Sequence, residues 1–158
     1  MKRYWPLFAL VLIAALEAVA VTYYVQKDLF VWMHFFMGFF LCKFAMLKLF
    51  NPKGFAEGFQ MYDVLAKKIP GYAYIYPLLE LSLGLAYLSS IYPIITYLIT
   101  VLVMAVGTLG VIRALKQGLD VRCACMGTTL NVPLSTVTLS EDIGMGIMAS
   151  IMLARSLM

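Results

Sequence analysis

Two cysteines separated by a single residue, Cys123 and Cys125, are the part of this 158-residue sequence best suited to chemistry. Thiols at this spacing form a disulfide only in a turned backbone, so the bridge would be strained and readily reduced. Arg122 directly precedes the pair, and its positive charge favours the thiolate, the form that attacks disulfides. We therefore predict a thiol–disulfide relay with Cys123, Cys125 and Arg122 as its catalytic residues. The alternative is a pair of small loop residues without function.

The same thiolates would also suit a soft metal ion. Met126 adds a thioether beside them, and two thiolates with a thioether match Cu(I) better than a hard cation. Further methionines recur at helical spacing in two apolar segments: Met33 and Met37, then Met145, Met148 and Met152. Methionine is also an ordinary gap-filling residue in apolar helices. A Cu(I) or other soft-metal transporter or acceptor therefore stays open beside the relay, and Cu(I) is the one cofactor that the sequence suggests.

Polar residues inside the apolar segments are a second set of candidates: Glu17, His34, Cys42, Lys43 and Glu80. Ionisable groups are costly in hydrocarbon unless they are paired, so each is a functional candidate. We place the end of one span, Phe50, and the start of the next, Tyr72, at the same face of the membrane. Cys42, Lys43 and Glu80 then lie roughly 10–12 Å deep. This predicts a Lys43–Glu80 ion pair beside Cys42, in either a functional or a structural role, whereas Glu17 and His34 have no obvious partner.

The composition identifies the elements that must position these residues. Hydrophobic residues make up 63% of the chain and charged residues 13%, and the mean hydropathy is +0.92. A soluble domain has about 25% charged residues, so the chain is expected to be a polytopic membrane protein. We predict one all-α bundle domain with five transmembrane helices of the length that a bilayer requires, at residues 6–25, 29–50, 72–90, 94–114 and 138–157.

Two connecting segments differ from the spans. Residues 54–68 place Phe55, Phe59, Tyr62 and Leu65 at helical spacing, which predicts a short amphipathic helix at the membrane interface. Residues 116–136 form a polar loop that holds the cysteine pair. Thr138-Leu139-Ser140-Glu141 after it fits a capping box at the start of the last span. Glycines on both flanking spans permit close helix crossings, namely Gly107, Gly110, Gly144 and Gly146.

Charges in the loops predict the topology. Most basic residues fall on one side of the membrane: Lys2, Arg3, Lys53, Lys67, Lys68, Arg113, Lys116 and Arg122. The other side has only Lys27 and Arg155, so the N-terminus and the cysteine pair are expected in the cytoplasm of a bacterial-type inner membrane. The net charge of +4 comes without any nucleic-acid motif, so we expect contact with lipid and not with nucleic acid.

The first span has a second interpretation. Ala18-Val19-Ala20 resembles a signal-peptidase site, so cleavage before Val21 would remove most of this segment. The apolar run continues past the site to Val25, and Glu17 stands where a signal peptide is normally uncharged. We therefore expect a retained span.

Two motifs resemble a known family. Cys123-Ala124-Cys125-Met126-Gly127, after the fourth span, resembles the Cys-x-Cys-Phe-Gly element of the MauE branch of the MauE/DoxX membrane proteins. Pro77-Leu78-Leu79-Glu80-Leu81-Ser82-Leu83-Gly84 is similar to that family's Pro-x-x-Glu-x-x-x-Gly stretch. Lys48, Phe55 and Tyr62 fall in a region similar to its second helix and following loop.

The likeness covers roughly residues 30–155 and implies a small helical bundle associated with thiol redox chemistry and a thioredoxin-like partner. It also implies proximity to copper-handling proteins, which keeps the metal hypothesis open. The sequence departs from the family pattern at Met126, where Phe is usual, and at Ser140-Glu141-Asp142, where a basic Arg-Asn is expected. We therefore do not carry over the family's role in methylamine dehydrogenase maturation. A non-catalytic assembly subunit of a larger membrane complex is a third hypothesis.

Overall fold

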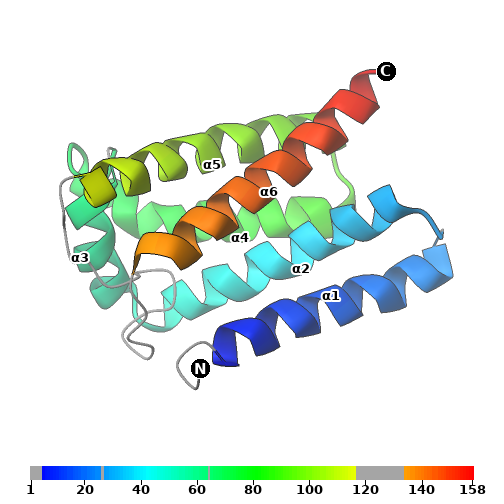
Figure 1. Cartoon of the computed structure of the whole chain (residues 1–158), viewed down its shortest axis with the longest axis horizontal. Helices are drawn as coiled ribbons and strands as arrows, with labels where there is room; N and C mark the ends of the chain where they lie inside the picture. Colours follow the sequence, from blue (N-terminus) through cyan, green and yellow to red (C-terminus); the bar gives the residue numbers. More distant parts are fainter. Residues whose placement is uncertain (1–4, 26, 64, 117–133) are drawn as a thin grey trace.

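A computed structural model describes residues 5–25, 27–63, 65–116 and 134–158. These residues form helices and no strand, in the order α1 (Trp5–Val25), α2 (Leu29–Phe50), α3 (Pro52–Tyr62), α4 (Pro70–Ser89), α5 (Pro93–Lys116) and α6 (Leu134–Leu157). The five long helices run alongside one another, and the short α3 lies across one end of the bundle (Figure 1). The predicted all-α bundle is confirmed.

Three of the described helices are long and apolar enough to cross a membrane: Leu7–Val25 of α1, Leu29–Phe50 of α2, and Pro93–Lys116 of α5. The helices α4 and α6 have similar lengths, 20 and 24 residues, but their mean hydropathy is reduced by polar residues such as Glu80, Glu141 and Asp142. The structure is thus a helical membrane bundle, and crossing of the membrane by α4 and α6 stays a prediction.

The short helix α3 ends earlier than expected. Its first turn is fixed by Asn51, whose side-chain oxygen accepts a hydrogen bond from the Gly54 amide at 3.1 Å. At the other end Asp63 has an extended backbone, and its carboxylate accepts the Leu65 and Ala66 amides at 2.9 and 2.8 Å. The chain therefore starts a separate turn after Tyr62, so the predicted helix over 54–68 was too long. The side chain of Tyr62 lies outside the described residues.

The helix α6 begins at Leu134, four residues before the predicted start. Residues 138–141 lie within the helix, so the expected capping box at its beginning is wrong. The predicted close approach of the last two helices is confirmed at Gly107, where an added Cβ would lie 3.0 Å from Asp142 Oδ2. At Gly146 a Cβ would meet Met104 Cβ at 3.7 Å, whereas Gly144 faces open space and contributes no contact.

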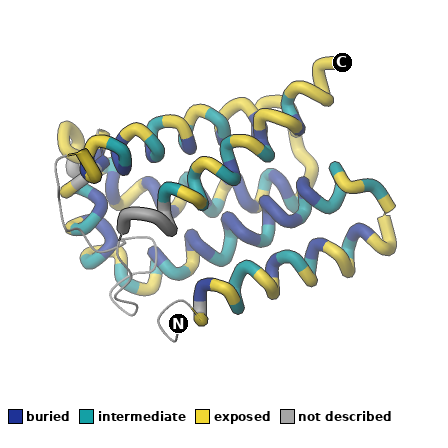
Figure 2. Tube along the Cα trace, in the orientation of Figure 1, coloured by how far each residue is buried: buried dark blue, intermediate teal, exposed yellow. Residues whose placement is uncertain are grey.

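The core of the bundle is centred on α2, which contacts α1, α4 and α6. Figure 2 shows buried residues along much of α2 and exposed residues on the outer faces of α1, α5 and α6. The aromatic face of α3 is also buried, with the Phe59 ring 4.7 Å from that of Tyr76 on α4. The predicted amphipathic helix is therefore present, and its apolar face packs against one end of the bundle.

Candidate functional site

The predicted catalytic residues Arg122, Cys123 and Cys125, and the candidate metal ligand Met126, lie outside the described residues. The two helices that flank them are described. The end of α5 and the beginning of α6 lie at the same end of the bundle as α3 (Figure 1). The environment of that end is therefore the part of the candidate site that the structure shows.

A buried ion pair joins α2 to α4 near this end. Lys48 Nζ donates a hydrogen bond to the Glu80 carboxylate, and the two side chains are only 4% and 5% exposed. The ammonium also lies over two aromatic rings, 5.6 Å from the centroid of Phe55 and 5.0 Å from that of Tyr76. Burial of two charges is tolerated where they satisfy each other, and the ring faces add attraction for the cation. The pair is thus enclosed by α2, α3 and α4.

The predicted Lys43–Glu80 ion pair is wrong, because the register of α2 against α4 differs from the assumed one. Cys42 lies opposite Gly84, so that an added Cβ at Gly84 would be 2.7 Å from the Cys42 sulfur. The assumption that Phe50 lies opposite Tyr72 misplaces α4 by about one helical turn, or about 6 Å. The first turns of α4 extend past the end of α2 to contact α3, which brings Glu80 to Lys48.

Lys43 instead pairs with Glu17 on α1, a residue that the sequence left without a partner. This second ion pair is less enclosed, since the Lys43 side chain is 22% exposed and that of Glu17 is 39% exposed. A hydrogen bond from Trp32 Nε1 to the Ala15 carbonyl, at 3.3 Å, joins the same two helices. The five candidate buried polar residues therefore divide between several interfaces and do not form one cluster.

The Pro-x-x-Glu-x-x-x-Gly stretch forms the part of α4 that packs against α2. Glu80 and Gly84 are four residues apart and thus lie on one face of α4. Glu80 pairs with Lys48, and Gly84 admits the backbone and sulfur of Cys42, both on α2. Pro77 is also fully buried inside α4. The motif is therefore the surface through which α4 meets α2, and Cys42 fills part of that helix crossing.

His34 is a hydrogen-bonded residue of the core. Its Nδ1 lies 2.7 Å from the Tyr97 hydroxyl, and its Nε2 lies 3.3 Å from the Ser90 hydroxyl. These contacts link α2 to α5 and to the end of α4. The partners are 63 and 56 residues away in the sequence, so no local pattern could have identified them. This geometry supports a packing function for His34.

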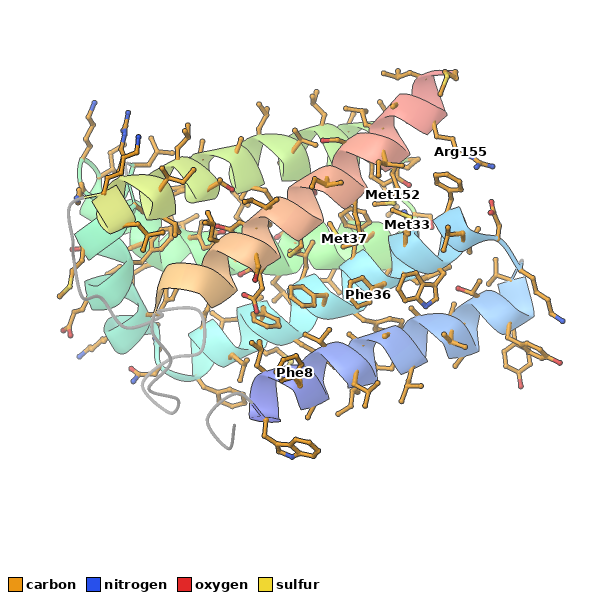
Figure 3. The ribbon with its side chains drawn as sticks, viewed as in Figure 1. Phe8, Met33, Phe36, Met37, Met152 and Arg155 are labelled. Atoms are coloured by element: carbon orange, nitrogen blue, oxygen red, sulfur yellow. The ribbon has the colours of Figure 1, made fainter. Side chains whose placement is uncertain are left out.

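The methionines predicted as a metal path lie in the core. Met33, Met37, Met145 and Met152 are buried, and Met148 packs against them. Figure 3 shows Met33 and Met37 of α2 on the side of that helix that faces α6, near Met152. Among the described residues, His, Cys, Asp and Glu form no group of three that would hold a metal. The thioethers are thus packed in the core between α2 and α6. A soft metal ion bound by them would lie between these two helices.

Fold and site together define a small helical membrane protein whose helices are joined by internal ion pairs. The sequence profile of the family described as methylamine utilisation protein MauE matches residues 26–155, and the chain belongs to this family. The resemblance expected from the sequence is confirmed. The match begins after α1, so Glu17 lies outside it. No curated protein and no solved structure matches the chain.

Proposed function

We propose that the protein is a membrane-embedded thiol–disulfide relay that uses Cys123 and Cys125. In one direction, the two thiols lose two electrons and two protons as their disulfide forms, and a disulfide of a thioredoxin-like partner becomes a dithiol. A second dithiol then reduces the Cys123–Cys125 disulfide and is itself oxidised to a disulfide, which returns the relay to its starting state. The observation that carries this proposal is the Cys-x-Cys pair behind Arg122 in a chain of the MauE family.

The described helices provide suitable support for such a pair. Close packing of α5 against α6, at Gly107 and Gly146, holds both ends of the cysteine segment at one end of the bundle. Arg113 and Lys116 are exposed in the last turn of α5, so this end is electropositive. A positive environment favours thiolate over thiol and thereby speeds exchange.

The family also supports a part in methylamine utilisation. Met126 and Ser140-Glu141-Asp142 depart from the family pattern, which weighs against this role. Those departures concern the cysteine segment and the beginning of α6, whereas the Glu80–Gly84 face of α4 keeps the family pattern. Because the family match spans both parts of the chain, methylamine utilisation is the pathway in which we place the relay.

A Cu(I) acceptor or transporter is the second candidate, favoured by the methionines buried between α2 and α6. In that case Cys123 and Cys125 would bind the ion at the mouth of the bundle, with Met126 as a third ligand, and a copper-handling protein would be the partner. Thiolates and thioethers are the ligands that Cu(I) selects.

One preparation separates the hypotheses. The purified, reduced protein is analysed for bound metal and then titrated with glutathione buffers while free thiols are counted. The relay predicts metal-free protein with one two-electron transition that Cys125→Ser abolishes and Cys42→Ser leaves in place. Stoichiometric copper that is lost in Cys125→Ser would instead support the metal function. If the protein shows neither bound copper nor a two-electron transition, the assembly subunit is supported and the relay is contradicted.

The exposed charges support the proposed topology. At the α3 end, five basic side chains are exposed: Lys53, Lys67, Lys68, Arg113 and Lys116. At the opposite end the described basic residues are Lys27 and Arg155, and Arg155 lies 3.6 Å from the Asp28 carboxylate. We therefore propose that the α3 end and the cysteine segment face the cytoplasm of a bacterial-type inner membrane.

A further inference from the structure

The Glu17–Lys43 ion pair lies far from both ends of its helices. Glu17 is about 18 Å along α1 from Trp5 and about 12 Å from Val25, and Lys43 is about 10 Å from Phe50. The hydrocarbon core of a bilayer is about 30 Å thick, so the pair belongs to the hydrocarbon region of these spans. Neither side chain is near the water at the ends of the bundle.

The pair is nevertheless exposed on the outer surface of the bundle. The Glu17 side chain is 39% exposed, whereas the Lys48–Glu80 pair is closed off by α3 and α4. From the described residues, Lys43 is the partner that reaches the Glu17 carboxylate. Among the described helices, α1 packs mainly against α2. Lipid chains offer no hydrogen bonds to a carboxylate, so the exposed charge is costly unless a protein surface covers it.

The surface is complementary to itself. It presents an acid and a base whose charged groups meet, on a side of α1 where Ile13, one turn before Glu17, and Tyr24, two turns after it, are also exposed. Two copies inserted in the same orientation place identical residues at identical depth. A two-fold axis along the membrane normal then brings Glu17 of one copy toward Lys43 of the other, as an isologous interface requires.

We propose that this α1/α2 face, centred on Glu17 and Lys43, is the contact surface of a homodimer. The four charges form one network shielded by both copies, and the apolar residues around it supply the packing. This proposal does not depend on the cysteine chemistry, because the face lies on α1 and α2 and the cysteine segment lies between α5 and α6.

Cross-linking tests the dimer without disturbing the ion pair. In a chain whose three native cysteines are replaced by Ala, Ile13→Cys places a thiol one helical turn from Glu17 on the same face, and Leu102→Cys places one on the exposed side of α5. A membrane-permeant bismaleimide is expected to link two copies through Ile13→Cys and not through Leu102→Cys. Equal yields from both positions, or a product that contains another protein, would overturn the homodimer.

Charge variants test the ion pair itself. Two differently tagged copies are co-expressed, and their copurification is measured in lipid nanodiscs. Glu17→Gln is expected to weaken self-association by about threefold to thirtyfold, the range that one polar contact between membrane helices supports. The double variant Glu17→Lys with Lys43→Glu exchanges the two charges and restores the acid–base contacts of both copies. It should therefore recover self-association. A native protein that is monomeric in nanodiscs, or an exchange variant no better than Glu17→Gln, would contradict the proposal.

Discussion

Lys43 and Lys48 lie five residues apart on α2 and pair with acids on different helices. Five residues turn an α-helix by about 140° beyond one full turn, so the two ammonium groups point away from each other. Lys43 meets Glu17 on α1, and Lys48 meets Glu80 on α4. The rotation of α2 within the bundle is therefore fixed from two sides.

The Lys48–Glu80 pair should be strongly coupled in stability. Lys48→Met leaves the Glu80 carboxylate buried without its cation, and we expect a loss of about 3–5 kcal/mol in the free energy of unfolding. The double variant Lys48→Met with Glu80→Met removes both charges and should recover most of that loss. Denaturant unfolding in detergent, followed by tryptophan fluorescence, measures both. If removal of Lys43, and not of Lys48, were compensated by Glu80→Met in the free energy of unfolding, the Lys48–Glu80 pairing would be wrong.

Gly84 should not tolerate a methyl group. An added Cβ would lie 2.7 Å from the Cys42 sulfur and 2.9 Å from the Cys42 backbone nitrogen, so α2 and α4 would have to separate. We expect Gly84→Ala to cost about 1–3 kcal/mol, with only partial recovery on adding Cys42→Ala, because the backbone contact remains. Gly144→Ala is the matched control, since it meets no atom within 4 Å. Equal unfolding midpoints for the two glycine variants would contradict the close crossing.

Asp63 should make stability depend on pH in the acidic range. Burial raises the pKa of this carboxyl above the usual aspartate range, and hydrogen bonds from the Ala66 and Leu65 amides offset only part of the effect. The folded protein then binds this proton more tightly than the unfolded chain. The contribution to stability is present below the ordinary aspartate pKa and is lost as pH rises through the raised value.

Asp63→Asn keeps an oxygen that accepts both amide hydrogen bonds but has no titrating carboxyl group. Its free energy of unfolding should therefore not decrease as the pH rises through the raised Asp63 pKa. Asp63→Ala also loses the two hydrogen bonds and should be less stable than Asp63→Asn by about 0.5–2 kcal/mol. Unfolding measured across the acidic range in one detergent compares the three proteins. A decrease of the same size in Asp63→Asn would assign the pH dependence to other groups.

Sidedness has a direct measurement. Intact cells are treated with a membrane-impermeant maleimide after mild reduction, and the same reagent is then applied to permeabilised cells. We expect Cys125 to be labelled only after permeabilisation, because the distribution of basic residues predicts a cytoplasmic loop. A relay that serves periplasmic disulfides would be simplest with its cysteines outside. Efficient labelling of Cys125 in intact cells would reverse the topology and favour that arrangement.

The sequence predicted the helices well because their apolar runs are long and are separated by short polar breaks. It placed Phe50 at the end of α2, as the structure does, and found the amphipathic α3 from the spacing of Phe55 and Phe59. The start of α6 was misplaced because Ser140, Glu141 and Asp142 are typical of a helix start but here lie within the helix.

The side-chain partners were less predictable. The sequence identified Lys43 and Glu80 as charges that need partners, but which charges meet depends on the register between helices. That register is set by the Cys42–Gly84 contact and by the first turns of α4, which extend past α2 and pack against α3. The spacing of apolar residues within one helix predicts neither contact. Lys48 was identified only through the family resemblance. A lysine so close to the end of a span can also reach water, so its position does not require a buried partner.

The two ion pairs also bear on how the chain enters a membrane during synthesis. As a solitary span, α2 would place two lysines in or near hydrocarbon, at about 2.5–3.5 kcal/mol for each one at a central position. Its acids arrive on either side of it in the order of translation, with Glu17 on the preceding helix and Glu80 on the following long one. We therefore expect the insertion of α2 to be coupled first to α1 and then to α4.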